Sequence, residues 1–352
     1  MKNTTLKLTH DLLELVTKLS HVLDKNSLAW CLASLLYQKS IPEVSEDFFQ
    51  TLKLERSVFE NINAEYKKIQ SLKKLSGIPG FVRMSPHVNL SKELALLAHD
   101  DETLAILQNG FQKLWKNTTQ WSHQVIHLKL RFPHSIKLLT LPDTAHTFAS
   151  ILELLIEKNY AHKPTAVTTI FDLGTNLGIS ACFLHDLYPA AHIVCVEPCT
   201  ETFNFLKQNL SQNNIKATLL NGAVSTEKGE AVLYKHRAGN LLHSIAFNNP
   251  VEYTSHTKVK TFTINELIPL ARKNSFGIKL DIEGCEHSLV DTKNLLKQAS
   301  WIVGELHYGS FYAQKGFESF LLQHFNVSVK NPNCSLDAFK QLKISQDFSA
   351  IQ

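Results

Sequence analysis

The chain shows its fold most clearly at residues 168–178, which read Thr-Thr-Ile-Phe-Asp-Leu-Gly-Thr-Asn-Leu-Gly. A short apolar and β-branched run contains Asp172, and two glycines, Gly174 and Gly178, follow just before a helical stretch. This is the pattern of a strand, a tight turn and a helix, in which glycine lets the backbone approach a ligand and the helix pack on the sheet. The stretch therefore predicts a ligand-binding loop at the carboxyl end of a buried strand.

Downstream of this loop, short strand-like runs alternate with helical stretches. The predicted strands are 168–173, 192–197, 217–221, 258–262, 277–282 and 301–306. Strands that alternate with helices of about 10–15 residues indicate a parallel sheet with helices on both faces. The predicted fold class is therefore α/β, with a doubly wound, Rossmann-like sheet over residues 165–330.

Upstream of the loop, the pattern changes twice. Residues 124–141 alternate between polar and apolar, which predicts a β-hairpin, and a helix over 144–160 follows. Apolar residues of the first 120 recur at helical spacing, and ten of the thirteen glycines lie at or after Gly174. We expect an all-α N-terminal domain over 1–120 and an α/β domain over 121–352, with the hairpin and its helix within 121–163. The helical domain could be a lid, a docking surface or the contact of a homodimer, and its sequence does not choose among them.

Composition excludes several classes of protein. The 352 residues are 44% hydrophobic and 19% charged, as in ordinary globular proteins. The net charge of +4 is too small to favour nucleic acid as a partner. The longest early apolar run, 28–37, is half of what a bilayer requires, so no membrane span is expected. The six cysteines form no C-x-x-C pair, so we expect neither a zinc site nor a disulfide framework, and a cytoplasmic location.

The loop and the next strand together indicate a ligand. Glu197 ends the strand after that of Asp172, where a carboxylate can accept both hydroxyl hydrogens of a ribose. A dinucleotide-binding loop would read G-x-G-x-x-G, whereas this one reads D-x-G-x-x-x-G, with an acid that repels phosphate but suits an amino group. S-adenosylmethionine has a ribose and an amino group but no phosphate, and it is the predicted cofactor. A glycine-rich turn without a ligand and a nicotinamide oxidoreductase are the alternatives.

Six motifs, in this order, resemble those of the FkbM-type S-adenosylmethionine-dependent methyltransferases. They are D-L-G-T-N-L-G, V-E-P, N-x-x-x-N-N, G-A-V-S-x-x-x-G, K-L-D-I-E-G-C-E and G-E-L-H, within about residues 124–330. The resemblance implies a class I methyltransferase fold and methylation of hydroxyl groups on sugars, glycans or secondary metabolites. The residues that it implies at the cofactor are Asp172, Gly174, Asn176 and Gly178 in the loop, Glu197 and Pro198 at the ribose, Gly222 and Ala223 at the adenine, and Asp281 beside the sulfonium.

Methylation of an alcohol requires that its proton be removed, because an alcohol is a poor nucleophile. Asp281 and His307 lie at the carboxyl ends of the predicted strands 277–282 and 301–306, and we hypothesise that His307 is the general base, oriented by Asp281 or Glu305. The alternative is that His307 is a loop histidine without a chemical role. The expected mechanism uses no metal; a Mg²⁺ ion would have to be held by Asp281, Glu283, Glu286 and His307.

The predicted acceptor is a small molecule or a glycan. The segment 236–256 and the aromatic residues Tyr308, Phe311 and Tyr312 are candidate acceptor contacts. Buried Lys279 is expected to pair with a carboxylate such as Glu283. A methyltransferase acting on protein or nucleic acid and a non-catalytic partner protein on the same fold are the two other classes. The intact glycine loop and ribose acid disfavour the partner protein.

Overall fold

The computed structural model describes residues 90–115, 120–157, 160, 167–236, 245, 253–272, 275–286, 289, 292, 296–306, 317–329 and 346–351. Contacts between Cα atoms divide the chain into two compact units, and the described residues other than 113–115 belong to the unit formed by 85–112, 120–330 and 345–352. This unit includes helices upstream of residue 120. The helices expected over 1–89 lie outside the described residues.

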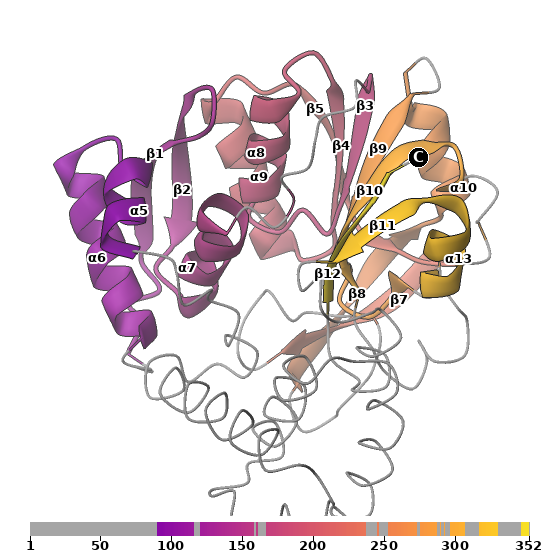
Figure 1. Ribbon diagram of the computed structural model, residues 1–352. Helices are drawn as coiled ribbons and strands as arrows, with labels where there is room; N and C mark the ends of the chain where they lie inside the picture. Colours follow the sequence, from indigo (N-terminus) through magenta and orange to yellow (C-terminus); the bar gives the residue numbers. More distant parts are fainter. Residues whose placement is uncertain are drawn as a thin grey trace, which may run out of the picture. The chain divides into compact units, whose positions relative to one another are not determined.

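A seven-stranded sheet forms the centre of this unit (Figure 1). Its order is β11-β12-β10-β9-β3-β4-β5, and all strands are parallel except β12, which runs antiparallel to β10 and β11. Numbered in chain order from the β5 edge, the strands read 3-2-1-4-5-7-6, the doubly wound order with one antiparallel strand inserted near the end. The predicted α/β, Rossmann-like fold class is confirmed. The strands are β3 (Thr169–Leu173), β4 (His192–Glu197), β5 (Ala217–Asn221), β9 (Phe276–Leu280), β10 (Ala299–Leu306), β11 (Asn326–Val329) and β12 (Gln346–Ile351).

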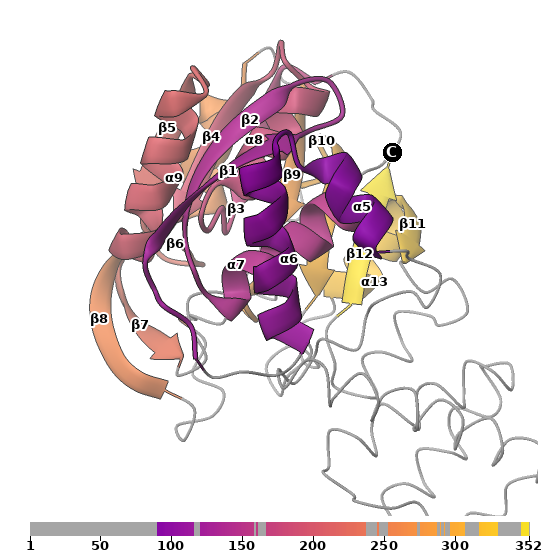
Figure 2. The ribbon, with the colours of Figure 1, turned by 90° about the vertical axis from the view of Figure 1, so that its left-hand side faces the viewer.

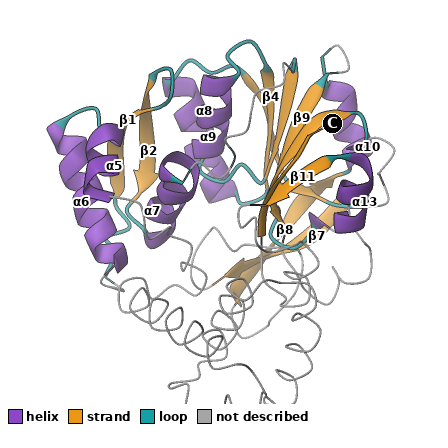
Figure 3. Ribbon diagram, in the orientation of Figure 1, coloured by secondary structure: helices purple, strands orange, loops and turns teal. Residues whose placement is uncertain are grey.

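Helices lie on both sides of this sheet (Figure 3). One side carries α8 (Ile179–Leu187) and α9 (Thr200–Gln212), and the other carries α10 (Ile264–Leu267), the 3₁₀ turn η4 (Ile268–Leu270) and α13 (Phe317–His324). Because both faces are covered, every residue of β3 and β9 is buried, including Asp172 and Lys279, and their apolar residues do not alternate with exposed polar ones. Among the described helices, none is both long and apolar enough to cross a membrane.

A hairpin precedes the sheet, as predicted, and packs on α9. Its strands β1 (Val125–Arg131) and β2 (Ile136–Pro142) are antiparallel, and α5 (Leu90–Leu97) and α6 (Asp101–Trp115) come before them. Asn209 of α9 accepts from Thr140 N at 2.7 Å and donates to Thr140 O at 3.1 Å and Leu177 O at 2.8 Å. This buried amide thereby ties the hairpin to the glycine loop, which gives the N-x-x-x-N-N motif a structural role. The helix expected over 144–160 is α7 (Ala145–Ile151), continued by a π-helical turn, η1 (Leu152–Ile156).

A second, three-stranded sheet lies beside the central one, below α9 in Figure 2. It consists of β6 (Ala223–Val224), β8 (Tyr253–Phe262) and β7 (Gly229–His236), in that order. The predicted strand 258–262 belongs to this sheet and not to the central one. Leu233 of β7 packs in a buried cluster with Cys199, Ala223 and Val259, so the small sheet forms an apolar wall next to the end of β4.

Candidate functional site

The glycine loop has the backbone geometry that its sequence suggested. Gly174 has φ +79°, and a Cβ there would lie 1.8 Å from Asp281 O, so only glycine fits. Asn176 and Gly178 also have positive φ, 52° and 87°. The backbone N–H of Gly174 donates to Val196 O at 3.0 Å, and that of Asp281 to Leu173 O at 3.1 Å. These contacts bring the ends of β3, β4 and β9 together at one edge of the sheet.

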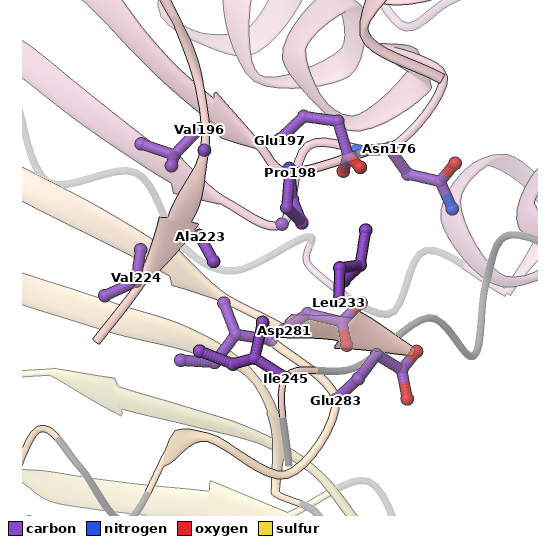
Figure 4. A pocket seen from close by; sticks show the side chains of 13 residues that line it. Asn176, Val196, Glu197, Pro198, Ala223, Val224, Leu233, Ile245, Asp281 and Glu283 are labelled. Carbon is purple, nitrogen blue, oxygen red and sulfur yellow. Dashed lines mark hydrogen bonds between the residues drawn. The ribbon is translucent and has the colours of Figure 1, made fainter. Parts of the chain in front are cut away.

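A cleft that is partly open to solvent lies at this edge (Figure 4). Its floor and rim contain seven of the nine residues predicted for the cofactor: Gly174, Asn176, Glu197, Pro198, Gly222, Ala223 and Asp281. The apolar wall is formed by Val196, Val224, Leu233 and Ile245. The remaining two predicted residues do not line this cleft. Gly178 begins α8 and packs against Leu206, and Asp172 is completely buried.

Glu197 is held at the base of the cleft by two backbone donors. Its Oε2 accepts from Asn176 N at 2.9 Å and its Oε1 from Cys199 N at 2.8 Å. Each oxygen has a second lone pair, so the carboxylate can still accept two ligand hydroxyls. Burial raises the pKa of Glu197 to about 7, although these two N–H groups and Lys279 favour its ionised form. A group that titrates near neutral pH is therefore placed where a ribose was predicted.

Behind the loop, a buried lysine joins two carboxylates. Lys279 Nζ donates to Gly174 O at 2.6 Å and lies 3.6 Å from Asp172 Oδ1 and 3.5 Å from Asp281 Oδ2. Burial lowers the pKa of Lys279, but Asp281 and Asp172 outweigh it and hold this pKa above its ordinary value. Lys279 is thus charged, and it pairs with carboxylates as predicted, though with these two and not with Glu283.

Asp172 lies in the protein interior, behind the glycine loop. Its Oδ2 accepts from Ser180 Oγ at 2.7 Å, and burial raises the pKa of its carboxyl against the opposing effect of Lys279. Asp172 has no exposed surface and contacts Lys279 and Ser180, and its predicted contact with a ligand amino group stays a prediction.

Asp281 has a further partner that the sequence did not indicate. Tyr160, which is buried, donates from its phenol oxygen to Asp281 Oδ2 at 3.1 Å, and the Lys279 ammonium lies 5.6 Å from the centre of its ring. The two residues are 121 positions apart in the chain. The fold brings Tyr160 to the end of β9, where Asp281 lies.

A second cleft adjoins the first and shares Gly174, Asn176 and Asp281 with it. Most of its other lining side chains are polar: Ser150, Glu153, Tyr160, Thr175, Ser180 and Lys279. The first cleft therefore combines an apolar wall with a ribose-type carboxylate, and the second offers hydroxyl and charged groups. Asp281 lies where the two meet.

The residues that would have to hold a Mg²⁺ ion differ in burial and in position. Glu286 is fully buried, and its Oε1 accepts from the backbone N–H groups of Ile282 and Gly284, at 3.2 and 3.3 Å. This oxygen therefore stabilises the turn over residues 282–286. Glu283 lines the first cleft. His307 lies outside the described residues. Within the described part of the chain, no three His, Cys, Asp or Glu side chains are grouped as metal ligands would be.

Two residues that line the clefts, Leu233 and Tyr160, were not predicted from the sequence. Ile245 lines the first cleft and falls within the segment 236–256, which was predicted to contact the acceptor. Most of that segment lies outside the described residues, as do Tyr308, Phe311 and Tyr312. Those acceptor contacts therefore stay predictions.

Comparison with known proteins gives a similarity of fold. No family model and no curated protein matches the chain. A solved structure of the methyltransferase FkbM from Methylobacillus flagellatus KT is 12% identical, covers 74% of this chain and 57% of that chain, and has a TM-score of 0.37. This match spans little more than half of the Methylobacillus chain.

Two further structures are similar in the same way. Precorrin-6y C5,15-methyltransferase from Geobacter metallireducens GS-15 is 14% identical over 54% of this chain and 84% of that chain, with a TM-score of 0.30. The N-terminal domain of human METTL16 in complex with SAH is 13% identical over 72% and 84%, with a TM-score of 0.29. The doubly wound, Rossmann-like sheet expected from the sequence is the one observed, by its own strand order. At these identities and TM-scores the comparisons say nothing about what this chain does.

Proposed function

We propose that this chain is an S-adenosylmethionine-dependent methyltransferase of the FkbM type, which transfers a methyl group to a hydroxyl of a sugar, glycan or secondary metabolite. The observation that supports it most is the convergence of seven motif residues, from four separate segments, on one cleft with Glu197 at its base. The fold is compatible with this activity but does not by itself choose the substrate.

The charges of the first cleft favour this cofactor over a dinucleotide. Glu197, Asp281 and Glu283 line it, and no lysine or arginine does so among the described residues. A pyrophosphate would meet carboxylates without a compensating cation. A ligand with a ribose, an adenine and a positive charge suits the same surface: Glu197 would accept from the ribose, and Leu233, Ile245 and Val224 would pack on the adenine.

The amino-acid end of the cofactor would then extend into the second cleft. Its hydroxyl and charged groups, among them Ser150, Thr175 and Glu153, suit an ammonium and a carboxylate better than an aromatic ring. In this orientation the reacting centre falls where the clefts meet, beside Asp281.

S-adenosylmethionine supplies the methyl group and a thioether leaving group when it is bound. The chain has to hold the acceptor in line with it, which alone can contribute about 7–11 kcal/mol, and to take the hydroxyl proton. In this proposal His307 is the general base, and Asp281 or Glu305 orients it. The net reaction forms one O–C bond, breaks one C–S bond and releases one proton.

Calorimetric titration of the full chain with S-adenosylmethionine and S-adenosylhomocysteine, with NADH in parallel, tests the proposal. We expect both sulfur compounds to bind and NADH not to bind. Glu197→Ala should weaken both affinities at least about tenfold, because it removes the ribose acceptor. Glu230→Ala, on an exposed stretch of β7, is the matched control and should change neither. Binding of NADH alone, or an unchanged affinity in Glu197→Ala, would overturn the assignment.

A further inference from the structure

The junction of the two clefts contains a single charged side chain. Three residues line both clefts, namely Gly174, Asn176 and Asp281, and only Asp281 carries a charge. A ligand that occupies both clefts must pass this carboxylate with its middle part.

In the proposed cofactor, the middle part is the positive charge. The sulfonium lies between the adenosine, which suits the apolar wall and Glu197, and the amino-acid end, which suits the polar second cleft. After methyl transfer the C–S bond is broken, its electron pair stays on sulfur, and the thioether is neutral. Substrate and product therefore differ in charge at the one point that faces Asp281.

Asp281 faces the junction with a carboxylate that is held from behind. Its Oδ2 accepts from the Tyr160 hydroxyl at 3.1 Å and lies 3.5 Å from Lys279 Nζ, and 24% of the Asp281 side chain is exposed. Lys279 Nζ also lies 3.6 Å from Asp172 Oδ1, so the ammonium is shared between two carboxyl groups. A ligand cation at the junction would therefore still be attracted to Asp281.

We propose that Asp281, held in place by Tyr160 and Lys279, recognises the charge of the sulfonium and so makes the site prefer S-adenosylmethionine to its product. This inference rests on the function proposed above. Asp281 is the specificity-determining group, and Tyr160 is a positioning residue that acts through it. The loss of charge on methyl transfer weakens the attraction and promotes release of the product.

The test compares three probes by calorimetric titration of the full chain. S-adenosylmethionine carries the sulfonium, sinefungin carries an amine in its place, and S-adenosylhomocysteine is neutral there. Asp281→Asn keeps the shape of the side chain and removes its charge. We expect it to weaken binding of the two cationic probes about tenfold and binding of the neutral one less than about threefold. Tyr160→Phe should produce a smaller loss with the same selectivity, because only the positioning hydroxyl is removed.

Glu283→Gln is the matched control, since it removes a carboxylate from the first cleft but not from the junction. It should leave the ratio of cationic to neutral affinities within about twofold of that of the unmodified chain. Equal weakening of all three probes in Asp281→Asn, or a loss of the same size in Glu283→Gln, would overturn the inference. If no probe binds the unmodified chain, it is the proposed function that fails. If Asp281→Asn does not fold, Tyr160→Phe decides, because it retains both carboxylates and the lysine; equal affinity losses for all probes would then refute the inference.

Discussion

Lys279→Met should destabilise the fold by about 3–5 kcal/mol, because it leaves buried Asp172 and partly buried Asp281 without their cation. The Nζ atom lies 3.6 Å from Asp172 Oδ1 and 3.5 Å from Asp281 Oδ2. At an effective dielectric constant of about 20, each pair corresponds to about 4–5 kcal/mol of attraction. Burial of the ammonium opposes this gain, and methionine removes that cost as well as the attraction, so the net loss is smaller than the sum. It is still a large part of the roughly 5–15 kcal/mol typical of a domain.

Urea denaturation followed by far-ultraviolet circular dichroism measures this loss. The same substitution at Lys258 is a matched control, because its Nζ lies 3.5 Å from Glu230 Oε2 but both side chains are mostly exposed. Solvent screens such a pair, and the control should lose almost nothing.

The pH dependence separates a charge effect from a packing effect. Burial raises the pKa of Asp172 in the folded state, and without Lys279 this pKa should rise further. An acid with a raised folded pKa binds its proton more tightly when folded, so the penalty grows as pH rises above the unfolded value of about 3.9. The loss in Lys279→Met should therefore be smaller at about pH 5 than at about pH 8. A loss below about 1 kcal/mol, or one that is the same at both pH values, would refute the reasoning.

Three other changes test the site and its support. Affinity for S-adenosylmethionine should rise with pH through about 7, because ionised Glu197 would accept the hydrogen bonds of the ribose hydroxyls and burial raises its pKa to about 7. A flat pH profile in calorimetry would contradict this. Gly174→Ala should abolish binding and destabilise the loop by at least about 1–2 kcal/mol, since its φ is +79° and its Cβ would meet Asp281 O; an unchanged affinity would show that the loop adapts. Asp186→Ala should lower the free energy of unfolding, measured by urea denaturation, by about 1–3 kcal/mol, because buried Asp186 accepts from His134 N at 2.7 Å in the hairpin turn. Cofactor affinity should not change, and a loss of affinity would instead connect this turn to the cleft.

The parts of the fold that the sequence predicted well are those with a strong local pattern. Strands β3, β4 and β9 are buried on both faces, so their apolar runs stand out, and the positive φ of Gly174 and Gly178 explains the glycines that mark the loop. Strands β7, β11 and β12 and the two-residue strand β6 were not predicted. Gly229–His236 carries charged residues along a partly exposed strand, and Gln346–Ile351 is polar at its start, so neither resembles a buried strand.

The site was predicted where each residue follows directly from the loop or from a strand end. Glu197 and Asp281 are of this kind, and both line the first cleft. Asp172 was correctly placed on β3, but the sequence could not show that Lys279 and Ser180 enclose it. Tyr160 was missed because its importance arises only from a contact with a residue 121 positions away.

The position of β12 has a consequence for how the sheet is made during synthesis. Because β12 lies between β10 and β11, β10 is paired only with β9, and β11 has no partner in this sheet, until the chain has been translated to residue 351. During that interval the edge of β10 is exposed, and an exposed edge can pair with strands of other chains. A nascent chain that stalls between residues 330 and 345 should therefore be more sensitive to protease and more prone to aggregate than one released after β12 has inserted.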